Sequence, residues 1–199
     1  MRAGRCASRS VIRACAAACL AVALCACTSL TPREAANVAD AAAAGAPFDI
    51  AGRLSARRGT DGGSASFVWR HEGGADEVDL ATPLGQTLAR LTGDAAGVRA
   101  QWPDGRTVEA RTWDELTERT LGVAIPVQGL SAWLRGRARA GTPGTVERDA
   151  QGRPAVLRQD GWEIVYAYPD DATPKASRLT LRYEQGQPAE VRLIIDRWQ

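Results

Sequence analysis

The sequence predicts a mainly β (α+β) domain, built as one curved antiparallel sheet of about eleven short strands with two short helices on its concave face. Apolar residues recur with a period of two in short segments that Gly-rich or Pro-containing breaks separate, which is typical of antiparallel strands. Only residues 112–136 have the period of amphipathic helices. Because this stretch lies between two blocks of strands, both helices are expected to pack on the sheet.

The first 26 residues have the form of a secretory signal. Four arginines and no acidic residue precede an apolar run from Ala14 to Ala26, which is shorter than the about 20 residues that a membrane-spanning helix needs. At its end, Leu24-Cys25-Ala26-Cys27 resembles the lipobox of bacterial lipoproteins, in which the last Cys is lipidated and becomes the first mature residue. Cys27 is therefore the predicted lipidation site. An ordinary signal peptide cut elsewhere, or modification at Cys19, is the alternative.

Removal of residues 1–26 changes the charge and the cysteine content of the chain. The whole sequence has 25 basic and 23 acidic side chains; the signal contains four of the arginines, so 21 basic and 23 acidic side chains remain. A net charge of −2 gives no support to nucleic-acid binding. Cys27 is the single cysteine of the remaining 173 residues, which excludes an internal disulfide and a thiolate metal site there.

Residues 27–47 are predicted to connect the lipid to a folded domain of residues 48–199. The segment from Thr28 to Ala46 is rich in alanine and polar residues and includes Pro32 and Gly45. As a flexible tether, these 19 residues have a root-mean-square reach of ~25 Å. A short helix over the alanine-rich residues 35–44 is the alternative.

Six strands are predicted before the helices. Gly-rich breaks at residues 59–63 and 72–75 are expected to be hairpin loops. Pro103-Asp104-Gly105 predicts a tight turn, because Pro presets the first central position and Asp-Gly tolerates a positive φ. The predicted strands cover residues 48–55, 64–70, 78–80, 86–91, 98–102 and 107–111.

The first helix is predicted to begin at a capping box. Thr112 and Glu115 have the required spacing, so that the Thr hydroxyl can accept a hydrogen bond from the amide of Glu115 while the Glu carboxylate reaches back. Gly122 is expected to end this helix, and Pro126 prevents its continuation. The residues on its inward face are Trp113, Leu116, Thr120 and Leu121.

A second helix and five more strands complete the predicted fold. The helix runs from about Val127 until Gly136 stops it, with Leu130, Trp133 and Leu134 on one face. Asp149–Gly152 and Gln185–Gln187 are predicted turns. The predicted strands cover residues 145–148, 155–159, 162–168, 178–183 and 190–198.

Catalytic and metal-binding chemistry finds little support in these residues, and we predict no catalytic residue, metal or cofactor. His71 is the one histidine, and a surface or loop-edge position is expected for it because no second His or Cys is available. Residues 59–63 lack the Lys-Ser/Thr of a phosphate loop. Asp160 and Glu163 could be proposed as a glycosidase pair, but Asp160 precedes Gly161 in a turn, which favours a structural role.

All six tryptophans lie in the predicted domain, which is a heavy use of large rings beside two phenylalanines. One interpretation is ordinary core packing, which aromatic side chains dominate. The other is an apolar cavity covered by the two helices, whose inward residues are then candidates for its lid or lining. These candidates are Trp113, Leu116, Leu130 and Trp133.

Thr82-Pro83-Leu84-Gly85, followed by the strand pattern of residues 86–91, resembles the Asn-Pro-Leu-Gly loop and next strand of the LolB family, whose members are outer-membrane lipoprotein receptors. Thr82 replaces the family's usual Asn, and it also suits the start of a turn. Three further segments resemble the family in its own order, and together they extend from Phe48 to Trp198. These are residues 125–127 with 130–136, 162–166 and 193–198.

The resemblance implies an incomplete β-barrel whose helices form a lid over an apolar cavity. It also implies a monomer, lipid-anchored in the outer membrane and facing the periplasm, that receives acylated lipoprotein cargo from the carrier LolA. The cargo is then placed in the inner leaflet of the outer membrane, without a cofactor. Two alternatives are a lipoprotein that binds a small lipid or metabolite, and a structural envelope lipoprotein with a filled core.

The resemblance also gives a role to the turn at Pro83, Leu84 and Gly85. Pro suits the first central position of a type I turn and Gly the position after the second, so Leu84 is expected at the apex. Its side chain could fold back on the core. The resemblance favours the other interpretation, in which Leu84 protrudes and inserts into the bilayer.

Overall fold

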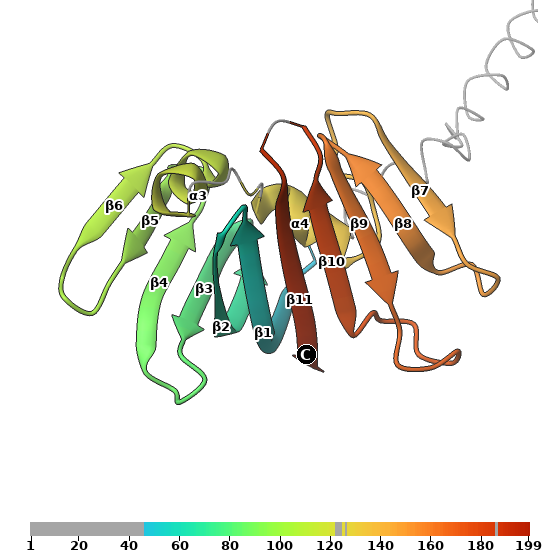
Figure 1. The fold of residues 1–199 in the computed structure, drawn as a ribbon, viewed down its shortest axis with the longest axis horizontal. Coiled ribbons are helices and arrows are strands. Elements are labelled where there is room, and N and C mark those ends of the chain that lie inside the picture. Colours follow the sequence, from blue (N-terminus) through green and yellow to red (C-terminus); the bar gives the residue numbers. More distant parts are fainter. Residues whose placement is uncertain (1–45, 122–124, 126, 186) are drawn as a thin grey trace, which may run out of the picture. The chain divides into compact units, whose positions relative to one another are not determined.

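The computed structural model describes residues 46–121, 125, 127–185 and 187–199 of the 199-residue chain. It confirms the predicted fold class: these residues form one open antiparallel sheet of eleven strands with two short helices (Figure 1). The helices are α3 (Trp113–Leu121) and α4 (Val127–Leu134). The strands are β1 (Phe48–Arg58), β2 (Asp61–Glu72), β3 (Ala75–Ala81), β4 (Thr87–Gly93), β5 (Val98–Gln101), β6 (Thr107–Ala110), β7 (Gly144–Arg148), β8 (Pro154–Gln159), β9 (Trp162–Ala167), β10 (Arg178–Tyr183) and β11 (Ala189–Trp198).

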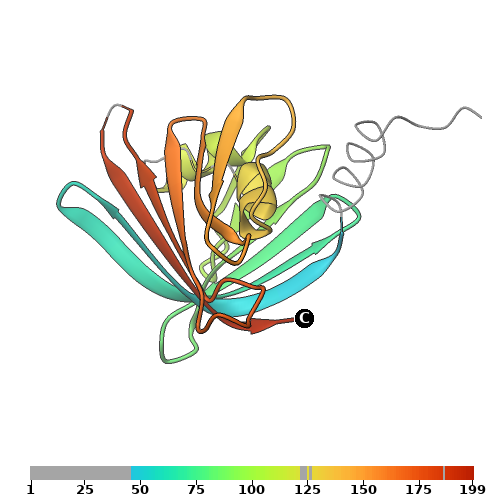
Figure 2. The same cartoon turned by 90° about the vertical axis from the view of Figure 1, so that its right-hand side faces the viewer.

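The strand order places the first and the last strand side by side at the centre of the sheet. From one edge to the other it is β6-β5-β4-β3-β2-β1-β11-β10-β9-β8-β7. Two meanders therefore spread from the β1–β11 pair, and β6 and β7 are the edges. The chain between these two edge strands contains α3 and α4, so it crosses the concave side of the sheet and leaves both helices there (Figure 2).

The β1–β2 hairpin is longer than the sequence predicts. Residues 59–63 were expected to form a loop, but β2 begins at Asp61, and Gly62 and Gly63 pair with Arg57 and Ala56 of β1. Likewise, Ala75 belongs to β3, and only Gly73 and Gly74 form the turn before it. The reason is that two-residue loops suffice for a hairpin, and glycines can extend a strand when a partner pairs with them.

The sheet has two arms, β1–β6 and β7–β11, and the β1–β11 pair that joins them is irregular. The pairing of β1 with β11 shifts between Ala51 and Gly52, as in a β-bulge. A Cβ atom added to Gly52 would lie 1.9 Å from the carbonyl oxygen of Ile194 in β11. The close approach of the two central strands thus requires a glycine at this position.

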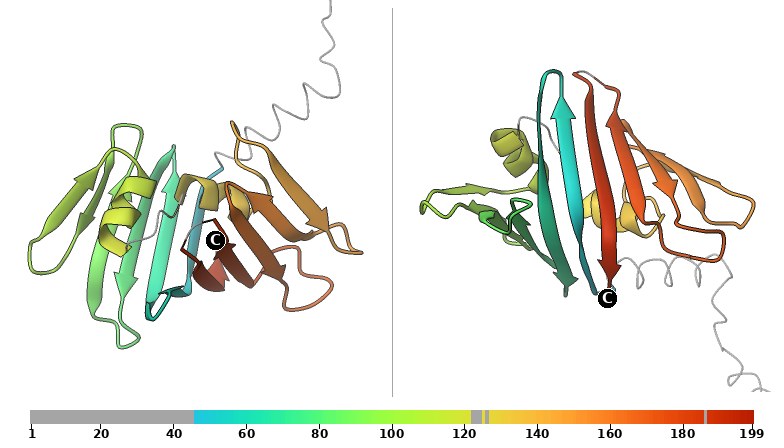
Figure 3. Two further views of the ribbon diagram at one scale, coloured as in Figure 1. Left: turned by 45° about the horizontal axis from the view of Figure 1, so that its top comes forward. Right: turned by 60° about the horizontal axis from the view of Figure 1, so that its bottom comes forward.

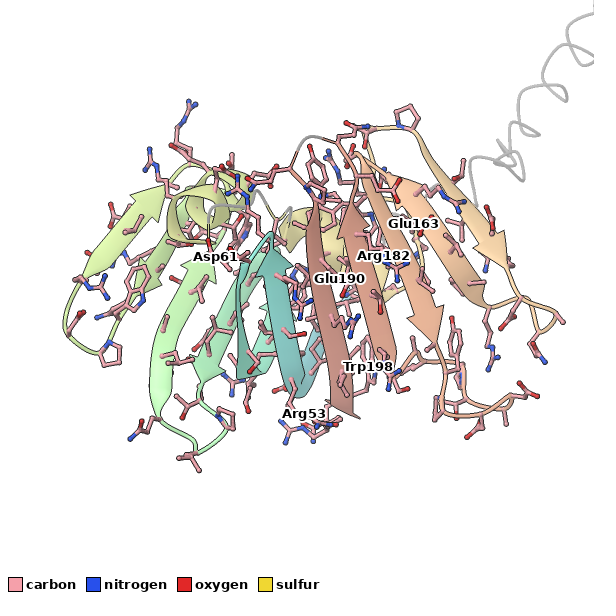
Figure 4. All side chains as sticks on the ribbon, in the orientation of Figure 1. Arg53, Asp61, Glu163, Arg182, Glu190 and Trp198 are labelled. Carbon is pink, nitrogen blue, oxygen red and sulfur yellow. The ribbon has the colours of Figure 1, made fainter. Side chains whose placement is uncertain are left out.

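The two faces of the sheet differ in chemistry because side chains alternate along each strand. Trp162, Ile164 and Tyr166 of β9 are buried on the concave side. Arginines and acidic residues cover the convex side; for example, Arg182 contacts Glu190 at 3.3 Å and Glu163 at 3.7 Å (Figure 4). Such exposed pairs contribute little to stability, so the concave core holds the fold together.

Both helices occupy the predicted positions on the concave side (Figure 3). At the start of α3, the Glu115 amide donates to the Thr112 hydroxyl at 3.2 Å, and the Glu115 carboxylate accepts from the Arg111 amide at 3.0 Å. The carboxylate thus reaches one residue further back than a capping box requires. Helix α4 ends at Leu134, and Gly136 follows with a φ of 69°. The predicted breakers Gly122 and Pro126 lie outside the described residues.

Candidate functional site

An apolar cavity of about 430 Å³ is lined by both helices and by strands β1–β5 and β11. None of the described residues that line it is charged. A space of this size is within the range of ligand pockets, about 300–1,000 Å³. Its large lining side chains are Leu54, Phe67, Trp69, Val78, Leu80, Leu88, Leu91, Trp102, Trp113, Ile125, Val127, Leu130, Val191 and Leu193.

Helix α3 covers the cavity, and the ring of its Trp113 packs directly against Gly93 of β4. We call this contact the seat of α3. Trp113 is 2% exposed, and a Cβ atom added to Gly93 would lie 2.6 Å from its Cζ2 atom. The ring can approach the strand this closely because Gly93 has no side chain. At the next turn, the Thr117 hydroxyl donates to the Trp113 carbonyl at 2.9 Å and accepts from the Ile125 amide at 2.7 Å. This hydroxyl links the lid to Ile125, which follows it in the chain.

Helix α4 contributes Val127 and Leu130 to the cavity, and its Trp133 packs against Trp162 of the other arm. Trp133 is fully buried, and its indole N–H donates to the Gln159 side-chain oxygen at 2.8 Å. The Gln159 amide nitrogen donates in turn to the Thr142 carbonyl at 2.9 Å, and the Tyr166 hydroxyl donates to the Trp133 carbonyl at 2.6 Å. A buried polar group with its partners satisfied fixes the position of the helix.

The four residues proposed for the lid or lining have different positions. Trp113 and Leu130 line the cavity. Leu116 and Trp133 are fully buried at 0% exposure and are not among the lining residues. The physical reason is that each helix directs a broad apolar face inward, and the cavity touches only part of it. Most of the lining comes from strand residues that the sequence analysis did not single out, although their alternation could have identified them.

Some tryptophans pack in the core and others line the cavity, so both of the roles that the sequence left open occur. Trp69, Trp102 and Trp113 line the cavity. Trp133 and Trp162 pack against each other at the other arm, with ring centroids 6.5 Å apart. Core packing and cavity lining thus divide between the two arms of the sheet.

The turn between β3 and β4 extends from the sheet at its lower edge in Figure 1. The Gly85 amide donates to the Thr82 carbonyl at 2.9 Å, the bond that closes a β-turn, and Gly85 has a φ of 86°. Leu84 is 92% exposed, so its side chain does not fold back on the core. Leu88 is 38% exposed and also lines the cavity. Within the described parts of the chain, these two are the exposed large apolar residues.

His71 does not have the surface position that was expected. It is buried, and its Nδ1 lies 2.8 Å from the Asp76 carboxylate, which also accepts from the Trp69 indole N–H at 2.8 Å. The ring stacks on Phe48 with centroids 5.3 Å apart. Because His71 and Asp76 are cross-strand partners, the carboxylate supplies the partner that makes burial of the ring possible.

Three further predictions from the sequence concern Asp160, metal binding and Cys27. Asp160 has a φ of 54° in its turn and pairs with Arg139 at 2.5 Å, which agrees with a structural role. No cluster suited to hold a metal ion occurs among the residues that the structure describes, and no helix among them is long and apolar enough to span a membrane. Cys27 lies outside the described residues.

Known proteins resemble this chain in sequence and in fold. The family described as "Outer membrane lipoprotein LolB" matches residues 46–198. The LolB of Cupriavidus metallidurans is 39% identical over 185 residues, covering 87% of this chain and 89% of the relative. That of Azoarcus sp. is 38% identical over 187 residues, covering 92% and 94%.

A crystal structure of a LolA superfamily protein from Nitrosomonas europaea has a similar fold. The TM-score is 0.50 at 10% sequence identity, covering 78% of this chain and 86% of that one. An identity this low is informative about the fold alone. The family match spans the whole sheet together with its lid, and the full-length relatives agree with it. The chain therefore belongs to the LolB family of outer-membrane lipoproteins.

Proposed function

We propose that this protein receives lipoproteins from a periplasmic LolA carrier and inserts them into the inner leaflet of the outer membrane, where it is itself anchored. Membership of the LolB family supports the role in lipoprotein trafficking. The apolar cavity under α3 is the observation that carries the mechanism. It provides a dry site for acyl chains and needs no covalent chemistry.

The energy of exposing an acyl chain explains why such a cavity is needed. One chain has about 14 methylenes, and each contributes ~0.8 kcal/mol when it leaves water, so a free chain costs on the order of 11 kcal/mol. Transfer through water is therefore too slow to be useful. A cavity that accepts the chain directly from another cavity avoids this cost. A structural lipoprotein has no need of unfilled space, so the cavity disfavours that alternative.

The volume of the cavity limits what it holds with α3 in its present position. A methylene occupies roughly the volume of a water molecule, ~30 Å³. The 430 Å³ cavity thus accommodates about 14 methylenes, which is one acyl chain. Cargo with more than one chain requires α3 to move outward. Helix α3 is the candidate for this movement because it covers the cavity, with Trp113, Thr117 and Thr120 among the lining residues.

Leu84 and Leu88 supply a route from the cavity to the membrane. Leu88 extends the lining outward, and Leu84 lies four residues earlier at the exposed apex of the turn. Insertion of Leu84 into the bilayer contributes ~2 kcal/mol, enough to orient the protein and too little to anchor it. We infer that Leu84 directs the open end of the cavity to the leaflet that receives the cargo.

Leu84→Glu tests this role. We expect a folded protein that accepts cargo from the carrier normally and delivers it to liposomes roughly 10- to 30-fold more slowly, because about 2 kcal/mol of membrane interaction is lost. Acceptance is measured as cargo that moves from carrier to this protein, and delivery as cargo that then sediments with liposomes. Gln86→Glu is the matched control, since it adds the same charge two residues away at an exposed position.

Normal delivery by Leu84→Glu would show that the apex does not enter the membrane. Equal slowing by Gln86→Glu would show that added charge alone is responsible. Failure of the unmodified protein to take cargo from the carrier would contradict the receptor function itself.

The membrane anchor follows from the N-terminal segment and is part of the proposal. Residues 1–26 act as a lipoprotein signal, Cys27 carries the lipid, residues 27–47 are the tether and residues 48–199 are the domain. The position of β1, which begins at Phe48, supports this division. Mass spectrometry of the mature N-terminal peptide is expected to detect acylated Cys27. An unmodified peptide, or cleavage at another residue, would contradict the anchor.

A further inference from the structure

The cavity has two ends of different chemistry. Leu88 and Trp102 line it on the side of the β3–β4 turn, where the exposed residues are apolar. At the end near the β1–β2 hairpin, the cavity continues into a second space of about 410 Å³, which we call the vestibule. Both spaces share five lining residues, which shows that they adjoin: Ala56, Gly63, Thr120, Ile125 and Val191.

Three charged residues line the vestibule, Arg57, Arg58 and Asp61, and strand geometry directs Arg58 into it from the face of β1 that lines the cavity. Side chains alternate along β1, so Leu54 and Ala56, which line the cavity, share their face with Arg58. Arg58 lines the vestibule and is half-buried. The neighbouring Arg57 starts from the opposite face of β1, across from Glu190 of β11, and also borders the vestibule.

The guanidinium of Arg58 has no acidic partner among the described residues. Its cross-strand neighbour is Asp61, at the hairpin end of β2 (Figure 4), yet no ion pair joins them within 4.0 Å. Convex-face arginines such as Arg53 and Arg90 do have such pairs, with Asp196 and Asp79. A partly desolvated guanidinium favours an anion, and its planar array of donors matches a carboxylate or a phosphate.

We propose that the cavity and the vestibule together bind a single-chain anionic amphiphile, with its tail in the cavity and its carboxylate or phosphate at Arg58. The volume selects one chain, because the cavity accommodates about 14 methylenes. Two guanidinium groups against the one carboxylate of Asp61 give the described lining of the vestibule a net positive charge, which selects an acidic head group. A fatty acid and a lysophospholipid both meet these conditions. The inference rests on the proposed function to the extent that the cavity must admit an acyl chain.

Such a ligand changes how cargo is accepted. A chain that occupies the closed cavity keeps its apolar walls dry between deliveries, and incoming acyl chains must displace it. The head group at Arg58 and the cargo's own polar end then compete for the same vestibule. Cargo acceptance is expected to slow as the concentration of the amphiphile rises.

The test compares palmitate with hexadecanol, which has the same chain length and no charge. Binding is measured by displacement of a fluorescent apolar dye from delipidated protein that carries Cys27→Ala. We expect palmitate to bind at least about tenfold more tightly than hexadecanol, because a charge-assisted hydrogen bond is added. Arg58→Gln should remove this preference and leave hexadecanol binding unchanged. Arg53→Gln is the matched control, because it removes the same charge from the convex face of β1 at a residue that lines neither the cavity nor the vestibule.

Each outcome has a distinct meaning. Equal affinity for palmitate and hexadecanol, or equal loss in Arg53→Gln and Arg58→Gln, would overturn the head-group site while leaving the acyl cavity intact. Failure of both compounds to displace the dye would contradict the proposed function of the cavity. Lysophosphatidylglycerol distinguishes a phosphate head group from a carboxylate head group. If it binds more strongly than palmitate, the ligand's head group is a phosphate. If it binds more weakly, the head group is a carboxylate.

Discussion

The seat of α3 on Gly93 gives a direct way to loosen the lid without substituting a residue that lines the cavity. In Gly93→Ala, the added Cβ atom would lie 2.6 Å from both Trp113 Cζ2 and Val98 Cγ1. Both contacts are far below the normal carbon–carbon distance, and neither partner can move freely because Trp113 and Val98 are buried. We expect the ring to be displaced and α3 to rise from β4.

The size of the effect follows from the cost of overpacking. An extra methyl group in a packed core costs about 1–3 kcal/mol. For a domain of this size, 1 kcal/mol shifts the melting temperature by about 2–4 °C, so Gly93→Ala should lower it by roughly 2–12 °C. Uptake of an apolar dye by the cavity should become faster at the same time, because the displaced lid no longer closes it.

A double-mutant cycle shows whether the clash with Trp113 is the cause. Trp113→Leu removes the ring atoms that Gly93→Ala would meet and keeps an apolar side chain. It destabilises the domain by itself, but the double variant should be more stable than the sum of the single changes by about 0.5–3 kcal/mol. Strictly additive changes in the free energy of unfolding would show that the clash with the Trp113 ring is not the cause of the destabilisation. Destabilisation with unchanged dye uptake would show that α3 is not the lid.

Two further predictions concern the contacts at each helix. Gln159→Leu leaves the Trp133 indole N–H without its buried acceptor and should destabilise the domain by about 1–3 kcal/mol in thermal unfolding, while dye binding to the other arm stays normal. The hydrogen bond from the Arg111 amide lowers the pKa of Glu115, so the stability that it contributes is present above the ordinary Glu pKa and lost as the pH falls through the lowered value. The difference in melting temperature between unmodified protein and Glu115→Gln should therefore shrink below about pH 4, and a constant difference would contradict this role.

Local patterns predicted most of the fold. Strand alternation identified all eleven strands, and the Thr112–Glu115 spacing located the start of α3, because caps and turns depend on neighbouring residues. The same holds for the β3–β4 turn, whose Pro83 and Gly85 predicted an apex at Leu84. The structure adds that the Leu84 side chain is 92% exposed and therefore does not fold back on the core.

The missed features depend on contacts between distant residues. Burial of His71 requires the carboxylate of Asp76, which only the register of β2 and β3 brings opposite. Helical periodicity showed that Trp133 faces inward, but not that a filled arm with Gln159 lies beneath it. Gly93 lies in the gap between the predicted strands 86–91 and 98–102, and its contact with Trp113 depends on how α3 docks.

Gly63 allows the cavity to be filled without strain. It lines both the cavity and the vestibule, and a Cβ atom added there would meet nothing within 4 Å. A leucine side chain has four carbons, which at ~30 Å³ each would fill about a quarter of the 430 Å³ cavity. Because glycine within a strand costs about 0.5–1 kcal/mol relative to alanine, Gly63→Leu should be at least as stable as the unmodified protein.

The same variant is expected to bind acyl chains more weakly and to accept less cargo from the carrier. Ser66→Leu is the control, because Ser66 lies in the same strand, three residues further on, and does not line the cavity. If Gly63→Leu is more stable but accepts less cargo, the unfilled space serves cargo binding and lowers the stability of the unmodified protein. Unimpaired cargo acceptance by Gly63→Leu would show that acyl chains do not reach the hairpin end of the cavity, and the lipid site would then have to lie nearer Leu88.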